Sequence, residues 1–177
     1  MSDNRPPAER PSLADLAPVL QAEFPVQQQP STPTQDGQLF VDLGADQRDR
    51  PRRLELMFLP HGDDLYFLQL FVLLPPPLLP EFAGELARVL LLINANLPLP
   101  GFGMQEAEGW VYFRCIVPCG NRKLDPNIDG EAILATTWVA SYQLDQFGEV
   151  IEDVAGGACT AADATTRVAA LANPISA

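Results

Sequence analysis

The sequence predicts an α+β fold, built from a five-stranded antiparallel sheet and three helices. Three observations lead to this class. The apolar pattern changes along the chain between the two-residue period of strands and the 3.6-residue period of helices. Short polar turns join successive strands, as in antiparallel meanders. The chain has 177 residues, of which 47% are hydrophobic, and this is enough for the core of one domain. The expected order is α-β-β-β-α-β-β-α.

The two ends of the chain differ in composition from its centre. Residues 1–11 are polar and rich in proline, so we expect a mobile N-terminal arm. A single α+β domain is expected over residues 12–157. The Ala-rich tail, residues 158–177, is expected to form a weak helix or to be disordered.

A short helix is expected over Asp15–Phe24, with Asp15 as its N-cap and Pro18 in its first turn, where proline does little harm. Its apolar stripe consists of Leu16, Val19, Leu20 and Phe24. Residues 25–35 contain mainly Pro, Gln, Ser and Thr, and this composition indicates a linker.

Three strands are expected next, over Gly37–Gly44, Arg53–Pro60 and Leu65–Leu74. The third is apolar on both sides, whereas a half-exposed strand should alternate with polar residues. One side carries Tyr66, Leu68, Leu70, Val72 and Leu74, and the other carries Leu65, Phe67, Gln69, Phe71 and Leu73. Helices can cover one side, and we assign Tyr66, Leu68, Leu70, Val72 and Leu74 to partner binding. A homodimer is the simplest cover; the alternative is that the N-terminal helix, the linker or the tail folds over the exposed side.

The second half of the chain predicts two helices that flank a hairpin. The second helix is expected over Pro80–Ala95, and its apolar spacing indicates burial on most sides. The hairpin is expected to pair residues 102–106 with residues 110–118 across an acidic turn. The long third helix is expected over Ile128–Ala155, and Gly156 and Gly157 stop it.

Asn94 and Asn96 interrupt an apolar run where the second helix must end. Asparagine tolerates left-handed backbone geometry and bonds freed backbone groups, so both are interpreted as structural, together with Gly101 and Gly103. The alternative is a pair of amides that binds a ligand.

The charge of the chain counts against several partner classes. The formal net charge is -12, which counts against nucleic acid and against anionic membrane surfaces. Pro75, Pro76 and Pro77 break the most apolar segment before it could span a membrane. With three cysteines and no visible secretory signal, we expect a cytoplasmic protein with reduced thiols, no disulfide, no metal and no cofactor.

Candidate chemical groups in the sequence have simpler interpretations. His61 is the only histidine, and it lies in a turn beside Asp63 and Asp64. Residues 125–131 begin like a calcium loop, but position twelve is Thr136 where a bidentate glutamate is needed. The basic cluster Arg48–Arg53 is interpreted as a solvated loop, with binding of an acidic partner as the alternative. The acidic third helix is interpreted as a solvated face, with attraction of a basic peptide as the alternative.

The second helix ends in Ile93, Asn94 and Asn96, followed by Gly101 and Gly103, an acidic turn at 106–109, a strand at 110–118 and a long helix. This pattern resembles the YbjN-like family, whose fold is shared with the class I chaperones of type III secretion. The resemblance implies a twisted antiparallel sheet with helices packed on it, a non-enzymatic role and a homodimer that binds an extended client segment. The chain departs from such proteins in its proline content.

No catalytic constellation is present in the sequence, so the chain is not expected to be an enzyme. We expect a protein-interaction module, chaperone-like or regulatory, that binds a protein or peptide through sheet and helix surfaces. The alternative is a small-molecule binder or an unrecognised enzyme that uses a cleft between sheet and helices.

Overall fold

The computed structural model describes residues 12–30, 37–59, 65–75, 77–121 and 129–172. It confirms an α+β fold with an antiparallel sheet, but the sheet has six strands and the described chain has four α-helices. The strands are β1 Val26–Gln29, β2 Gln38–Ala45, β3 Pro51–Leu59, β4 Leu65–Leu74, β5 Phe102–Gln105 and β6 Trp110–Asn121. The α-helices are α1 Leu13–Gln21, α2 Ala83–Asn96, α3 Gly130–Ala155 and α4 Ala161–Ala172, and the short 3-10 helices are η1 Pro80–Phe82 and η2 Glu106–Glu108.

The order of strands across the sheet is β1-β2-β3-β4-β6-β5. The first four strands therefore follow the chain, and the β5–β6 hairpin adds to β4 through β6. In the centre of the sheet Val41 pairs with Leu54, Leu56 with Leu70, and Leu70 with Cys115. The register shifts between Asp42 and Ala45 of β2 and between Leu65 and Phe67 of β4. Every neighbouring pair of strands is antiparallel.

Strand β1 corrects the expected linker, and with it the expected count of five strands. Val26 pairs with Val41 of β2, and three glutamines continue the strand along the edge of the sheet. A polar edge strand has no apolar alternation, because it makes backbone hydrogen bonds on one side and buries little. The pattern of apolar residues therefore could not reveal it.

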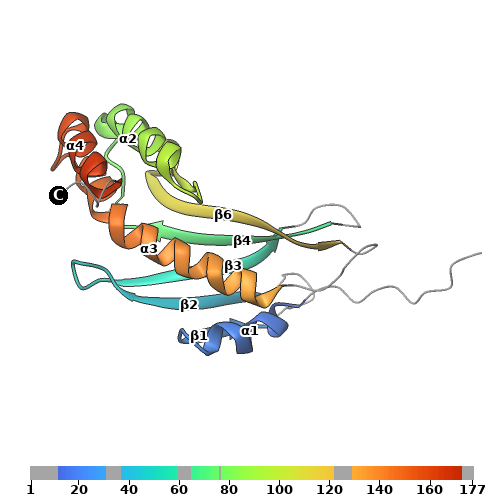
Figure 1. The fold of residues 1–177 in the computed structure, drawn as a ribbon. Helices are drawn as coiled ribbons and strands as arrows, with labels where there is room; N and C mark the ends of the chain where they lie inside the picture. Colours follow the sequence, from blue (N-terminus) through green and yellow to red (C-terminus); the bar gives the residue numbers. More distant parts are fainter. Residues whose placement is uncertain (1–11, 31–36, 60–64, 76, 122–128, 173–177) are drawn as a thin grey trace, which may run out of the picture.

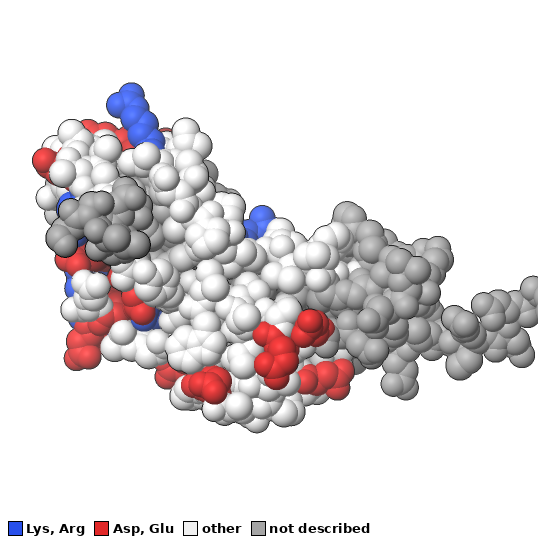
Figure 2. Space-filling view, viewed as in Figure 1, with Lys and Arg blue, Asp and Glu red and all other residues white. Residues whose placement is uncertain are grey.

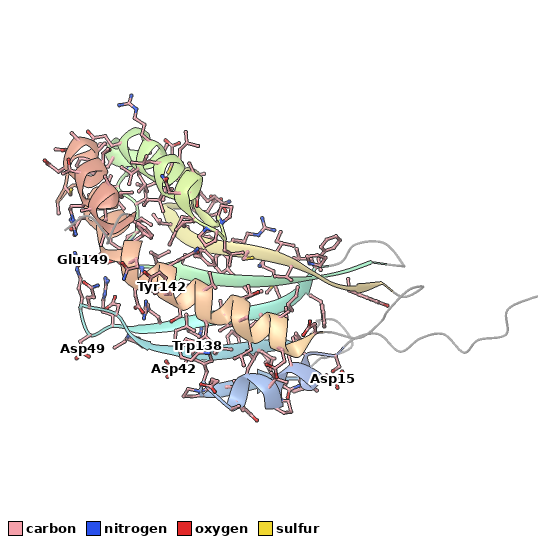
Figure 3. The ribbon with its side chains drawn as sticks, viewed as in Figure 1. Asp15, Asp42, Asp49, Trp138, Tyr142 and Glu149 are labelled. Carbon is pink, nitrogen blue, oxygen red and sulfur yellow. The ribbon has the colours of Figure 1, made fainter. Side chains whose placement is uncertain are left out.

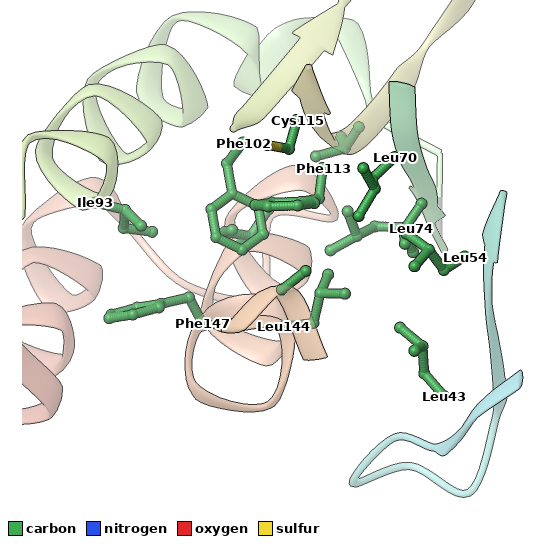
Figure 4. Close-up of a cluster of buried hydrophobic side chains, with 14 of the residues drawn as sticks. Leu43, Leu54, Leu70, Leu74, Ile93, Phe102, Phe113, Cys115, Leu144 and Phe147 are labelled. Atoms are coloured by element: carbon green, nitrogen blue, oxygen red, sulfur yellow. The ribbon is translucent and has the colours of Figure 1, made fainter. Parts of the chain in front are cut away.

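One face of the sheet is covered by helices. Figure 1 shows α3 lying across the strands, with α1 beside it at one end and with α2 and α4 packed together at the other. The covered face and the helices share one core, and Figure 4 shows leucines of β2, β3 and β4 together with Phe102, Phe113 and Phe147. Phe102 and Phe113 meet edge to face with ring centroids 5.2 Å apart.

Helix α1 begins earlier than the sequence indicates. Ser12 is its N-cap, and Ser12 Oγ accepts a hydrogen bond from the N–H of Ala14. The Asp15 carboxylate accepts the N–H of Ser12 at 3.4 Å, so Asp15 completes a capping box and is not itself the cap. The earlier start moves Pro18 beyond the first turn.

Residues 161–172 of the Ala-rich tail form a packed helix. Ala164 and Val168 of α4 are 0% and 1% exposed, and α4 contacts both α2 and α3. The N–H of Ala161 donates to Glu85 Oε2 of α2 at 2.8 Å. The domain therefore extends to residue 172, beyond the expected boundary at 157. Among the described residues, no helix combines the length and the apolar character that crossing a membrane requires.

Candidate functional site: the open face of the sheet

Strand β4 turns the face that we assigned to partner binding toward the helices. Leu68 and Leu70 are fully buried there, Val72 and Leu74 are 2% and 5% exposed, and Tyr66 is half-buried against the same core. The assignment is therefore corrected, because these side chains hold the sheet to its helices. Both sides of β4 are apolar, so the strand's own sequence could not indicate which side is covered.

The opposite face of the sheet carries large apolar side chains as well, and we call it the open face. On β4 it presents Phe67, Gln69, Phe71 and Leu73, of which Leu73 is 50% exposed. Its apolar members, from β2 to β6, are Phe40, Met57, Leu59, Phe67, Phe71, Leu73, Trp110, Tyr112 and Ile116. The rings of Phe71 and Tyr112 lie 5.5 Å apart across β4 and β6. This row of aromatic groups runs across strands that are far apart in sequence.

The segments proposed as an internal cover lie elsewhere in the described structure. Helix α1 packs beside α3, β1 extends the sheet, and α4 packs on α2 and α3. No described helix or strand therefore covers the open face.

The polar side chains of the open face pair with one another. Gln38 Nε2 donates to Glu55 Oε1 at 2.7 Å, and Arg114 Nε donates to Gln69 Oε1 at 2.7 Å. The guanidinium of Arg53 lies 4.6 Å from the centroid of the Phe40 ring. Such pairs satisfy polar groups within the surface, so a partner would not have to replace them with contacts of its own.

Two hollows mark the open face near the β2–β3 end. One, of about 480 Å³, is lined by Pro51, Arg53, Glu55, Phe71 and Leu73. The second, of about 420 Å³, is lined by Pro25, Val26, Gln27, Phe40, Asp42, Pro51, Arg52 and Arg53. Arg53 borders both hollows. A partner's side chains could enter on either side of this guanidinium.

The space between sheet and helices is small by comparison. It lies between the β3–β4 region and α3, bordered by Arg50, Arg52, Val72, Leu144 and Gly148 among others. The centre of a water molecule can occupy about 30 Å³ of it. A single water needs about 10–15 Å³ in this measure, so the space fits a few waters and no metabolite. The described structure therefore does not favour the small-molecule alternative at this place.

Asn94 joins the end of α2 to the start of β5. Its Oδ1 accepts the N–H groups of Gly101 and Phe102, each at 3.1 Å, and its Nδ2 donates to the Phe102 carbonyl at 2.7 Å. Asn96 Nδ2 donates to the Leu92 carbonyl at 2.8 Å in the last turn of the helix. Both side chains serve the backbone, and neither residue adopts the left-handed geometry that its type tolerates. The amide of Asn94 is committed to the protein and is not presented to a ligand.

Gly101 and Gly103 pack closely against β6. A Cβ on Gly101 would lie 2.7 Å from the Arg114 carbonyl oxygen, and one on Gly103 would lie 2.8 Å from the Tyr112 ring. At Gly101 the close atom belongs to the backbone of β6, so the hairpin needs glycine there. At Gly103 the close atoms are the outer end of the Tyr112 ring, which a larger residue would displace. This placement supports the structural interpretation of the pair.

The basic cluster and the acidic helix, each interpreted as solvated, meet in the structure. We call the result the α3 clamp: Arg48 and Arg50, from the turn between β2 and β3, bind Glu152 and Asp153 of α3, and Arg167 of α4 joins them. Arg48 Nη1 lies 3.4 Å from Glu152 Oε2, and Arg167 Nη1 lies 2.7 Å from Asp153 Oδ2. The acidic partner of the basic cluster is therefore a helix of the same chain.

Burial and pairing shift the two carboxylates of the clamp in opposite directions. Burial raises the pKa of Glu152 above its ordinary 4.5, although Arg50 and Arg48 oppose the shift. Burial also acts on Asp153, but hydrogen bonds from Arg167 and Arg48 outweigh it and lower its pKa below 3.8. Each arginine bonds a carboxylate, so the clamp fastens α3 to the β2–β3 turn and to α4.

The remaining candidate groups have structural positions or lie outside the described residues. His61, Asp63, Asp64 and most of the calcium-like segment lie outside them, while Asp129 caps α3 by accepting the N–H of Ala132 at 3.0 Å. Cys115 is buried, and burial raises the pKa of its thiol, which disfavours the nucleophilic thiolate. Within the described residues no group of three or more metal-ligating side chains comes together.

Reasoning from sequence identified β4 as the carrier of the surface but missed its neighbours. Phe40 was a signal, because it stands on the polar side of an otherwise alternating β2. Tyr112 and Ile116 of β6 were a second signal of the same kind.

Comparisons with family models, with curated proteins and with solved structures find no match for this chain.

Proposed function

We propose that this chain is a non-enzymatic protein-interaction module that binds through the open face of its sheet, and that a second copy of the chain is the occupant. The observation that carries the proposal is the open face itself, a row of aromatic and aliphatic side chains that no described element covers. Contiguous apolar patches beyond a few hundred Å² are uncommon on monomers and mark interaction sites.

The size of the face suits a stable interface. Six strands about 4.8 Å apart, with about eight residues at 3.3 Å each, span roughly 700 Å². Specific interfaces bury about 800 Å² on each partner. A face of this size can therefore form the core of a dimer without contributions from the helices.

Charge favours a second copy over an acidic or a basic partner at this face. Asp42 and Glu55 are balanced there by Arg53 and Arg114, although the chain as a whole carries a net charge of -12. In a two-fold dimer the same patch meets itself, and a patch with equal numbers of both signs can be complementary to itself. The open face therefore meets that condition.

The resemblance to the YbjN-like family and its secretion chaperone-like fold forms part of the same proposal. Its support is the run from α2 through the β5–β6 hairpin to α3, which has the expected order. Strand β1 and helix α4 are additions to that pattern. The resemblance also supports a chaperone-like or regulatory role in the cytoplasm, which forms part of the proposal.

Light scattering of the purified chain at micromolar concentration tests the proposal. The expected mass is twice the 19.3 kDa of one chain. Leu73→Glu places a charge on the open face and should give a folded monomer, because Leu73 is 50% exposed within one chain. Leu70→Glu should unfold the protein, because Leu70 is fully buried under the helices.

Leu91→Glu is the matched control. Leu91 is 73% exposed on α2 and lies outside the open face, so this variant should stay folded and keep the mass of the wild type. A wild type that stays at 19.3 kDa at every concentration would overturn the dimer. A Leu73→Glu variant that keeps the doubled mass would show that the copies meet elsewhere.

A further inference from the structure

Helix α3 exposes a second apolar surface, on the side of the molecule away from the open face. Trp138, Val139 and Tyr142 are 48%, 37% and 60% exposed, and we call them the α3 stripe. Trp138 and Tyr142 are four residues apart, so they lie one above the other on the helix. Figure 3 shows both on the outward side of α3, near the middle of the helical layer.

Trp138 is held in place by a neighbour. Its ring lies 4.6 Å from that of Phe24, which follows α1 and is itself 8% exposed. One part of the indole is thereby packed, while nearly half of the residue remains in solvent. An aromatic group that is already ordered loses little freedom when it binds, which is a property of interface anchors.

The surroundings of the α3 stripe are acidic. Neither α1 nor α3 contains a lysine or an arginine. Figure 3 places Asp15 and Asp49 around Trp138 and Tyr142, together with Glu149, which lies 3.6 Å from Arg48. Figure 2 shows the central surface of this view as largely uncharged, with many carboxylates and a few arginines at its border. The arginines that face α3 are already bonded to carboxylates: those of the α3 clamp lie toward one end of the helix, and Arg52 pairs with Asp145 at 2.6 Å.

We propose that the α3 stripe docks a basic amphipathic segment of a partner protein. Apolar side chains of that segment would pack on Trp138 and Tyr142, and its lysines and arginines would meet the surrounding carboxylates. The exposed aromatic rings add to this preference, because their faces attract ammonium and guanidinium groups. A second copy of the chain does not fit here, because it would bring two acidic borders together.

The test uses the full chain and a synthetic 18-residue amphipathic peptide of leucine and lysine, with binding measured by calorimetry. We expect saturable binding with one peptide per chain, weakened at least tenfold between 50 mM and 500 mM salt. Tyr142→Ala should weaken binding at least tenfold. Because Tyr142 is 60% exposed, this variant should fold as the wild type does, which its circular dichroism melt will verify.

Two controls separate docking from general attraction between opposite charges. A peptide of the same composition whose order destroys the apolar side should bind at least tenfold more weakly. A peptide with glutamate in place of lysine should not bind. Equal binding of the ordered and reordered peptides, or unchanged binding by both Tyr142→Ala and Trp138→Ala, would overturn the proposal.

Further variants distinguish this surface from the open face and report its location. Leu73→Glu should bind the peptide as well as the wild type does, whatever its mass, so the two proposals can fail separately. In a Trp110→Phe background, Trp138 is the remaining tryptophan, and its fluorescence should shift as peptide is added. An unchanged spectrum at saturation would place the peptide elsewhere and contradict the assignment.

Discussion

At the scale of single residues, Asn94 connects the end of helix α2 to the start of strand β5. A helix ends with carbonyl groups that lack partners, and a strand at the edge of a sheet begins with groups that are also unpaired. Three hydrogen bonds from one side chain serve the backbone of Gly101 and Phe102 at this junction. The side chain fixes the direction in which the chain enters β5.

Replacing Asn94 by alanine removes all three bonds and leaves part-buried backbone groups without partners. We expect the free energy of unfolding to fall by about 1–3 kcal/mol, measured by urea denaturation. Asn96→Ala is the control, because it removes one exposed bond within the last turn of α2 and should have a much smaller effect. Equal effects of the two substitutions would contradict the role assigned to Asn94.

At the scale of elements, the long periodic segments could be predicted from the sequence. The third helix was expected over 128–155 and is found at Gly130–Ala155. The strands β2, β3 and β4 were each located to within a few residues. These segments bury a continuous apolar side, so the physical cause of their folding is visible in their own residues.

Elements that depend on partners distant in sequence could not be predicted in the same way. Strand β1 is fixed by its register with β2, and α4 is fixed by α2 and α3. The same reason applies to the candidate site. Whether one side of β4 is covered or open depends on where α3 lies, and the residues of β4 alone do not record that.

The α3 clamp makes a prediction about pH. Asp153 has a lowered pKa in the folded protein, so its stabilising effect is complete above pH 3.8 and is lost as the pH falls further. The difference in unfolding free energy between wild type and Asp153→Asn should therefore shrink below pH 3.8. Urea denaturation at a series of pH values measures it.

Glu152 should show the opposite sign. Its pKa is raised, so the folded protein binds the proton before the unfolded chain does, and its contribution to stability grows as the pH falls toward 4.5. The wild type should therefore gain stability relative to Glu152→Gln between pH 7 and pH 4.5. The outcome that contradicts this is a difference in unfolding free energy from the wild type that varies with pH in the same direction for Glu152→Gln and for Asp153→Asn. Burial of Glu152 would then not control its titration.

At the scale of the whole molecule, the net charge of -12 acts differently on the two proposed surfaces. Two copies that meet through a balanced face still repel one another through the rest of their charge, and salt screens this repulsion. A basic peptide is attracted by the same charge, and salt weakens that attraction. The open face and the α3 stripe therefore respond to salt in opposite directions.

We expect the dissociation constant of the dimer to fall as salt is raised from 50 to 500 mM, while that of the amphipathic peptide rises. Sedimentation equilibrium measures the first and calorimetry the second. Neutral osmolyte at matched osmolality is the control, since it does not screen charge. Dimerisation that weakens with salt would indicate that ion pairs, and not the apolar residues of the open face, hold the copies together.

The covering of the sheet by α3 has a consequence for how the chain folds during synthesis. Arg48 and Arg50 are separated from Glu152 by 104 and 102 residues, so the clamp closes only after most of the chain has been made. At about 5–20 residues per second, the end of α3 follows the end of β4 by roughly 4–16 s. During that interval the side of β4 that carries Leu68, Leu70 and Val72 lacks the helix that covers it in the folded protein. The buried side of β4 therefore stays exposed until the C-terminal helices have been made, and transiently exposed apolar surface of this kind is prone to aggregation.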